Sequence, residues 1–194
     1  RQQTRYRCLR IQTLTFKKYA DKTYTFIYIT DKTQEMRKID IRIQIQHYAF
    51  EELPETDRAL VNKAMEATYN AYADYSNFYV GAALRLKDDT IVIGANQENA
   101  AFPSGLCAER SAIFAAQSQY PQQPITTLAV AARNTNGFLE QPITPCGACR
   151  QVILEIEDRY QSPIRILLYG KNGVYQINTV KDLLPLSFVD ANMR

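Results

Sequence analysis

Two short cysteine motifs constrain this chain more than any other feature. The sequence CAE occupies residues 107–109, and PCGAC follows at residues 145–149. A structural zinc is normally held by four protein ligands, whereas a catalytic zinc keeps three and leaves the fourth position to water. Apart from the three cysteines of these motifs, the chain offers only Cys8 and His47 as sulfur or imidazole ligands, and neither lies at a metal-like spacing. The motifs therefore predict one zinc ion with an open position, bound by Cys107, Cys146 and Cys149.

Glu109 lies two residues from the first of these ligands. It is too close to join the same tetrahedron comfortably, but it is well placed to reach the open position. We predict that Glu109 is a general base toward water and then a general acid toward the substrate. The alternative is an ordinary exposed glutamate on a helix.

The charge of an all-cysteine site needs compensation. Three thiolates around Zn²⁺ total −1, which weakens the metal as a Lewis acid. The predicted helix starts at the cysteines favour thiolates through their partial positive charge. Arg110 and Arg150 are the adjacent cations that could draw charge off the metal. For both arginines, a solvent-facing helix position is the alternative.

Hydrophobic patterning predicts the fold class. Helical spacing is expected over residues 54–73, 106–119 and 147–159, and strands over residues 78–86, 90–94, 127–132, 164–169 and 174–177. Two further stretches, residues 23–30 and 39–46, alternate with period two and could pair with each other outside this core. We therefore expect an α/β fold, a three-layer α/β/α sandwich around one mixed five-stranded sheet, with an extra N-terminal β segment.

The N-terminal part differs in charge from the rest. Residues 1–35 hold eight Lys or Arg against three Asp or Glu, whereas residues 36–194 hold fifteen against seventeen. The first methionine, Met36, begins a run that resembles a translation start, so residues 1–35 are expected to be upstream sequence or a dispensable extension. We predict an N-terminal extension with a β segment over residues 1–50 and a catalytic domain over residues 51–190.

Composition narrows the partners and the compartment. The 194 residues are 46% hydrophobic and 22% charged, as in an ordinary globular domain. Four cysteines, three of them in one constellation, do not resemble a disulfide framework. No apolar run approaches the roughly 18 residues of a membrane span. The slightly acidic composition around the predicted site disfavours nucleic acid as a partner. We expect a cytoplasmic protein that binds neither nucleic acid nor membrane.

Four blocks in order carry a resemblance to a known family. They are YSNFYVGAAL at residues 75–84, NQENA at 96–100, CAER at 107–110 and PCGACRQ at 145–151. They resemble the small, homotetrameric, zinc-dependent cytidine deaminases, in which Cys replaces the first His of the zinc deaminase signature. The likeness runs from about Leu53 to Phe188.

The resemblance implies an activity and a mechanism. The implied reaction is hydrolytic deamination of cytidine and 2′-deoxycytidine to uridine and deoxyuridine, as in pyrimidine salvage. Zinc-activated hydroxide attacks C4 of the ring while Glu109 shuttles the proton. The family also implies one zinc per subunit and a homotetramer with shared active sites.

The resemblance further implies roles for individual positions. Phe78 matches an aromatic residue that packs on the pyrimidine, and Ala108 matches a residue whose backbone holds the base. Asn96 and Glu98 match the pair that binds the ribose 3′-hydroxyl. Phe102 and Phe188 match aromatic residues that neighbouring subunits contribute to the pocket, and Arg110 matches an arginine that hydrogen-bonds the ligand thiolates. Two positions depart from the family, since Phe102 replaces a common Tyr and Leu186 replaces a small residue.

Three alternatives remain open. A deaminase of this fold could act on an aminoglycosyl-nucleoside antibiotic, a free base or a nucleotide, although Glu98 would repel phosphate. A polynucleotide deaminase would require a basic groove. A non-catalytic zinc-stabilised interaction module would require a fourth protein ligand.

Overall fold

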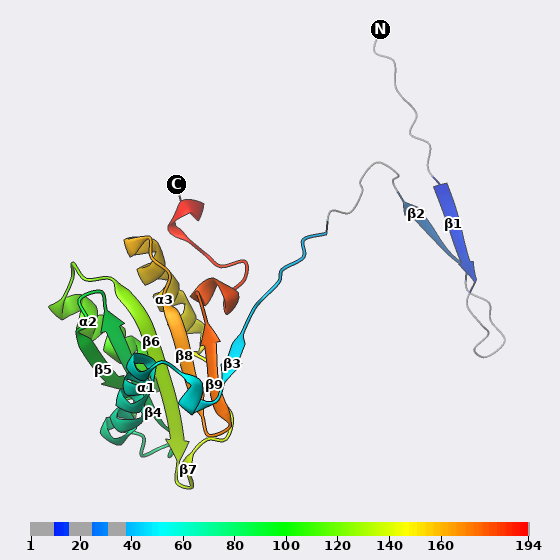
Figure 1. The fold of residues 1–194 in the computed structure, drawn as a ribbon. Coiled ribbons are helices and arrows are strands. Elements are labelled where there is room, and N and C mark those ends of the chain that lie inside the picture. The colour runs from blue at the N-terminus through cyan, green and yellow to red at the C-terminus, as the bar shows by residue number, and fades with distance from the viewer. Residues whose placement is uncertain (1–9, 16–24, 31–37, 194) are drawn as a thin grey trace. The chain divides into compact units, whose positions relative to one another are not determined.

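The computed structural model describes residues 10–15, 25–30 and 38–193 (Figure 1). The chain divides into two compact units between Ile41 and Arg42. In the first unit, β1 (Arg10–Thr15) pairs antiparallel with β2 (Thr25–Thr30). The second unit contains the motifs singled out above. The predicted domain boundary at residue 50 stays a prediction.

The second unit is built on one mixed sheet of seven strands. The strands lie in the order β3-β9-β8-β6-β4-β5, and β7 pairs with β6. Their bounds are β3 (Gln46–Tyr48), β4 (Tyr79–Leu86), β5 (Ile91–Ala95), β6 (Ile125–Asn134), β7 (Gly137–Phe138), β8 (Arg165–Gly170) and β9 (Gly173–Ile177). Only β6 and β8 are parallel neighbours; the other pairs are antiparallel. The mixed α/β class is confirmed, but the predicted count of five strands is wrong, because β3 and β7 are too short to show a period in the sequence.

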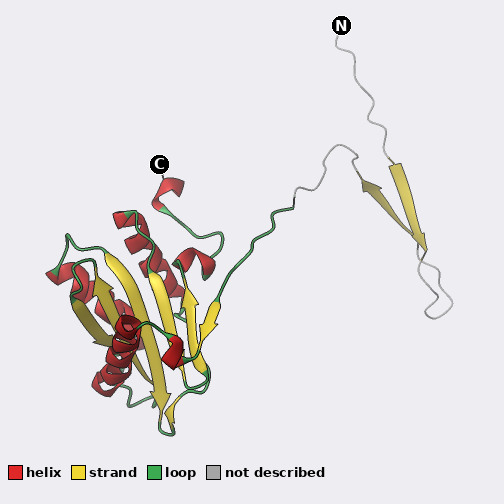
Figure 2. Ribbon diagram, viewed as in Figure 1, coloured by secondary structure: helices red, strands yellow, loops and turns green. Residues whose placement is uncertain are grey.

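Helices cover both faces of this sheet (Figures 1 and 2). Along β4, Val80, Ala82 and Leu84 pack with α2 (Ala108–Gln119) and α3 (Gly147–Tyr160), whereas Ala83 packs with α1 (Glu55–Ala67). This alternation is the period of a strand that is buried on both faces. The predicted helical and sheet layers are therefore present, with α1 on one face and α2 and α3 on the other.

Two glycines allow the helices to lie close to the strands. A Cβ atom on Gly81 would come within 2.1 Å of the Ala64 carbonyl oxygen in α1, and one on Gly94 within 2.4 Å of the Ala112 nitrogen in α2. Either contact would push helix and sheet apart. α1 is shorter than the predicted helix over residues 54–73, since it tightens into a 3₁₀ turn at Thr68–Asn70.

The predicted pairing of residues 23–30 with residues 39–46 is wrong. Within the described residues, β2 pairs with β1, and residues 38–45 join no ladder. The strand near this stretch begins only at Gln46, where β3 pairs with β9. The register places Gln46 opposite Gln176, and β9 ends one residue later at Ile177. By the same register Ile45 would lie opposite Ile177, so the residues before Ile45 run past the end of β9.

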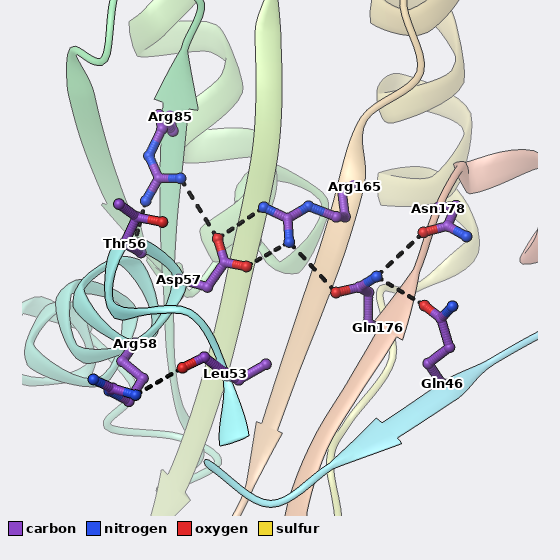
Figure 3. A network of polar contacts seen from close by, with 9 residues as sticks. All are labelled: Gln46, Leu53, Thr56, Asp57, Arg58, Arg85, Arg165, Gln176 and Asn178. Carbon is purple, nitrogen blue, oxygen red and sulfur yellow. Dashed lines mark hydrogen bonds and ion pairs between the residues drawn. The ribbon is translucent and has the colours of Figure 1, made fainter. Parts of the chain in front are cut away.

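A polar network ties α1 to the sheet (Figure 3). The Asp57 carboxylate accepts hydrogen bonds from both terminal nitrogens of Arg165, one of them at 2.7 Å. It also forms an ion pair with an Arg85 nitrogen at 3.5 Å. Arg165 also contacts Gln176, whose amide donates to Gln46 at 2.8 Å. The network links α1, β8, β9 and β3, so it fixes the edge of the sheet on the α1 face.

Among the helices in the described part of the chain, none combines the length and hydrophobicity that crossing a bilayer requires.

Candidate metal centre and substrate pocket

The three cysteines of the two motifs meet at the starts of two helices. Cys107 is the N-cap of α2, Cys146 is the N-cap of α3, and Cys149 lies in the first turn of α3. Their sulfur atoms all lie within 4.8 Å of one another. Because 39 residues separate the first two, the sheet must bring the two helix starts together.

The sulfur separations fit a zinc ion. A tetrahedral Zn²⁺ with Zn–S bonds of about 2.3 Å places its sulfurs about 3.8 Å apart. The Cys107 and Cys146 sulfurs are 3.8 Å apart, and the Cys146 and Cys149 sulfurs are 3.5 Å apart. Cys107, Cys146 and Cys149 would therefore hold the metal without rearrangement of either helix.

Negative charge in this cluster is held first by Cys107. A hydrogen bond from Cys149 and another from Arg110 lower the pKa of the Cys107 thiol to about 5. The pKa of Cys149 is raised, because its thiol bonds to Cys107 and is buried. The Arg110 Nη2 atom lies 3.4 Å from the Cys107 sulfur, while the Arg110 Nε atom is buried without a hydrogen-bond partner among the described residues. Arg110 thus contacts a thiolate, as expected of a cation that offsets the charge of the site.

Glu109 lies in the first turn of α2 and is only 4% exposed. Burial raises the pKa of its carboxyl group above the usual range. A carboxyl group whose pKa is raised holds a proton more readily than an exposed glutamate does, which suits a group that acts as base and acid in turn.

A pocket of about 490 Å³ opens beside the cysteines. Its lining includes seven of the predicted site residues: Phe78, Asn96, Glu98, Cys107, Ala108, Glu109 and Cys146. Ser76, Val80, Ile143 and Thr144 also line it and were not singled out from the sequence. Ile143 and Thr144 directly precede the PCGAC motif, which was the one signal that could have found them.

Asn96 and Glu98 hold the pocket wall by bonds to the backbone. The Asn96 side chain accepts from the Val80 nitrogen at 2.8 Å and donates to the Phe78 oxygen at 2.9 Å. The Glu98 carboxylate accepts from the nitrogens of Tyr75 and Ser76 at 2.8 and 3.3 Å. A hydrogen bond with the Ser76 side chain, together with these backbone bonds, lowers the pKa of Glu98. Each side chain keeps one further acceptor position.

Arg150 lies differently from the sequence-based expectation. Its Nε atom donates to the Pro145 oxygen, one terminal nitrogen to the Leu183 oxygen and the other to the Thr144 hydroxyl. The guanidinium is thus committed to oxygen atoms around the loop before Cys146, and it holds this loop rather than a thiolate.

Two predicted aromatic residues lie outside the cysteine pocket. Phe102 is exposed and borders a neighbouring cavity of about 300 Å³, where its ring meets Tyr75 edge to face at 6.0 Å. Phe188 is also exposed, and its carbonyl oxygen accepts a hydrogen bond from Gln151 at 2.9 Å. Neither ring lines the pocket beside Glu109.

Residues 54–161 match the family described as the cytidine and deoxycytidylate deaminase zinc-binding region. This chain belongs to that family. A cytidine deaminase of Halalkalibacterium halodurans is 39% identical over 134 residues, which cover 69% of this chain and 95% of the relative. One of Sporosarcina psychrophila is 41% identical over 129 residues, covering 66% and 88%. The crystal structure of cytidine deaminase from Burkholderia pseudomallei superposes with a TM-score of 0.58 at 38% identity, covering 67% of this chain and 97% of that chain.

Membership of the deaminase family agrees with the donor set in the structure. The family region binds zinc, and the three sulfurs have the spacing that zinc requires. The predicted zinc cofactor is thereby confirmed. The matched region ends at residue 161, so residues 1–53 and the C-terminal segment with Phe188 lie outside it.

Proposed function

We propose that this protein hydrolyses cytidine and 2′-deoxycytidine to uridine and deoxyuridine, with release of ammonia. The observation that carries the proposal is the shared pocket, which the buried Glu109 lines together with two of the clustered cysteines and the polar side chains of Asn96 and Glu98. The relatives described as cytidine deaminases support the same substrate class.

Zinc held by the three cysteines supplies Lewis acidity toward a water molecule in the pocket. Glu109 takes a proton from the attacking water as the oxygen bonds to C4 of the ring, and delivers this proton to N3. In the second half of the reaction, Glu109 carries the hydroxyl proton to the amino group, the C4–N bond breaks and ammonia leaves. One carboxyl group thus serves as base and acid in turn, which its buried position between both partners supports.

Other pocket residues bind the nucleoside. The Phe78 ring offers a surface for the pyrimidine, and the backbone of Ala108 at the start of α2 offers N–H groups to its polar edge. The ribose 3′-hydroxyl donates to Glu98 at the acceptor position that the backbone leaves free, and the second N–H of the Asn96 amide donates to the hydroxyl oxygen. Because Glu98 is ionised, it favours a hydroxyl over a phosphate, so an unphosphorylated sugar is the expected substrate.

The proposal includes assembly and location. A homotetramer would place the exposed rings of Phe102 and Phe188 at the pockets of neighbouring subunits, and their exposure supports this. The free thiols at Cys107, Cys146 and Cys149 support a reducing compartment, the cytoplasm. Residues 51–190 would form the catalytic domain, and Arg110 would tune the metal through Cys107.

One assay decides among the substrate classes. The purified full chain is incubated with cytidine, deoxycytidine, cytosine, cytidine monophosphate, blasticidin S and a cytosine-containing DNA strand, while ammonia release and bound zinc are measured. We expect about one zinc per chain and fast turnover only of the two nucleosides. Turnover of another compound alone would reassign the substrate, and zinc without any turnover would support a non-catalytic module. Sedimentation analysis tests the tetramer separately.

A further inference from the structure

Residues 38–45 form a strand-like sequence that has no partner within the described chain. Isoleucine recurs at every second position, namely Ile39, Ile41, Ile43 and Ile45, and all four side chains are exposed. Figure 2 draws this stretch as a loop that leads into β3. An exposed alternating segment at the edge of a sheet is a template for pairing with another chain.

The polar positions between the isoleucines select one kind of partner. Lys38, Asp40, Arg42 and Gln44 occupy the other face of the same stretch. In an antiparallel pair, residues directly opposite each other lie on the same face, and opposite charges there stabilise the pair while like charges destabilise it. For each way of aligning two copies of this stretch, we can therefore ask which charges lie opposite each other.

Among the registers about a two-fold axis, the one centred on Ile41 matches both the charges and the isoleucines. When Ile41 faces Ile41 of the other copy, Asp40 faces Arg42 of the other copy, and symmetry forms this pair twice. A shift that centres the pair on Asp40 opposes two aspartates, and a shift that centres it on Arg42 opposes two arginines. A parallel in-register pair would stack like charges along its whole length. A shift that centres the pair on Ile39 also brings Asp40 opposite a cation, Lys38, but it opposes Ile41 to Arg37. The register centred on Ile41 is therefore the one that both forms ion pairs and keeps isoleucine opposite isoleucine.

We propose that residues 39–43 pair with the same residues of a second copy, in an antiparallel ribbon centred on Ile41. One face of the ribbon gathers the isoleucines of both copies, and the other face carries two Asp40–Arg42 ion pairs. Such an interface is isologous, so it closes after two chains. A two-stranded ribbon by itself is marginal in water, so the pairing depends on protein concentration. These residues precede the matched deaminase region, which begins at residue 54, and the proposal is independent of the catalytic activity.

Cysteine cross-linking measures this register directly. In the full chain with Cys8→Ser, Ile41→Cys places two thiols opposite each other at the two-fold axis. Ile45→Cys is the matched control, because the two side chains are 52% and 50% exposed. The ribbon would hold the two Ile45 positions roughly 27 Å apart. With oxidised glutathione we expect Ile41→Cys to form the intermolecular disulfide at least about tenfold faster than the control, since distant cysteines cannot be bridged. Equal rates would overturn the proposal.

Swapping the charges at Asp40 and Arg42 tests the ion pairs, again by the rate of disulfide formation. In the Ile41→Cys background, Asp40→Arg alone and Arg42→Asp alone each oppose like charges, so both should cross-link slowly. The double variant with both substitutions restores the pairs, and co-expression of the two single variants should give a mixed disulfide at the parental rate. If the double variant stays slow, or the mixed product does not form, the antiparallel register is wrong. Pairing of the isoleucines with another part of their own chain would slow all variants equally and also overturn the proposal.

Discussion

The two faces of the sheet treat buried carboxylates in opposite ways. On the α1 face, Asp57 is 1% exposed and is held by the guanidinium groups of Arg85 and Arg165. On the α2 and α3 face, Glu109 is 4% exposed and forms no ion pair among the described residues. Its pKa is raised by burial. A carboxylate whose oxygens are bonded to arginines is structural, whereas a carboxylate that forms no ion pair with an arginine remains able to exchange a proton.

Glu157 shows that the contrast lies in the partners rather than in the face. This carboxylate shares the α3 layer with the cysteines and is almost fully buried. It accepts hydrogen bonds from the nitrogens of Ile164 and Val180, both at 2.9 Å, and from the Thr179 hydroxyl at 2.7 Å. Three donors place it with Asp57 as a structural group.

The largest effect is expected at Glu109, which is buried and forms no ion pair with an arginine in the part of the chain that the structure describes. Glu109→Gln keeps the shape of the side chain but removes the proton carrier, so kcat for cytidine should fall by roughly 10²- to 10⁴-fold. Bound zinc and the midpoint of urea unfolding should stay close to those of the parent. Near-normal turnover would end the proposed role of Glu109.

The next effect concerns stability on the α1 face. Asp57→Asn leaves two guanidinium groups without their carboxylate, and removing one partner of a buried pair costs about 3 to 5 kcal/mol. Because the Arg165 side chain is 32% exposed, we expect the lower end, about 3 kcal/mol of unfolding free energy. Urea titration measures the loss. A large fall in kcat of the folded variant without a loss of stability would reverse the assignment.

A smaller effect is expected where a cation meets the thiolates. Arg110→Gln removes the donor to the Cys107 sulfur, and loss of such a supporting contact costs roughly 10- to 100-fold in zinc affinity or activity. Competition with a chelator gives the affinity. Arg159→Gln is the control, because Arg159 on α3 bonds to Gln117 instead. Equal zinc retention in both variants would show that Arg110 does not tune the metal.

The smallest effect should come from Glu157. Glu157→Gln keeps one acceptor oxygen for the two backbone nitrogens and lets the Thr179 hydroxyl reverse its role, so only the charge is lost. We expect a loss of about 1 kcal/mol of unfolding free energy and unchanged kcat. A large fall in kcat of the folded variant would show that Glu157, like Glu109, takes part in catalysis.

Much of the core was accessible from periodicity. The buried strands β4, β6 and β8 and the helices α2 and α3 were predicted close to their observed bounds, since a continuous apolar run or a helical stripe is a local signal. α1 ends at Ala67, short of the predicted end at residue 73. β3 and β7 carry no such signal, because three and two residues are too short to show alternation. The alternating isoleucines of residues 39–45 predicted a strand, but the structure has none there. The neighbouring strand β9 ends too early to pair with most of them, and the sequence pattern alone does not show this.

The candidate site divides in the same way. The zinc ligands and Glu109 could be predicted because each of the two motifs combines its residue types at a short spacing. Arg150 was assigned to the thiolates from its position beside Cys149, yet its guanidinium contacts Leu183, 33 residues away. Ile143 and Thr144 line the pocket, but their residue types alone do not indicate a functional site.

By itself, the sequence predicted the ligand set, the acid–base residue and the alternation of the main strands, because each prediction rests on residue types at short spacings within one motif or one element. Only the tertiary structure decided which buried carboxylate is neutralised. Asp57 and Arg165 are 108 residues apart in sequence. They meet because α1 packs on one face of the sheet and the Arg165 side chain of β8 reaches Asp57 on that face. The cysteines of α2 and α3 meet on the opposite face for the same reason, since close packing leaves each helix one position against the strands.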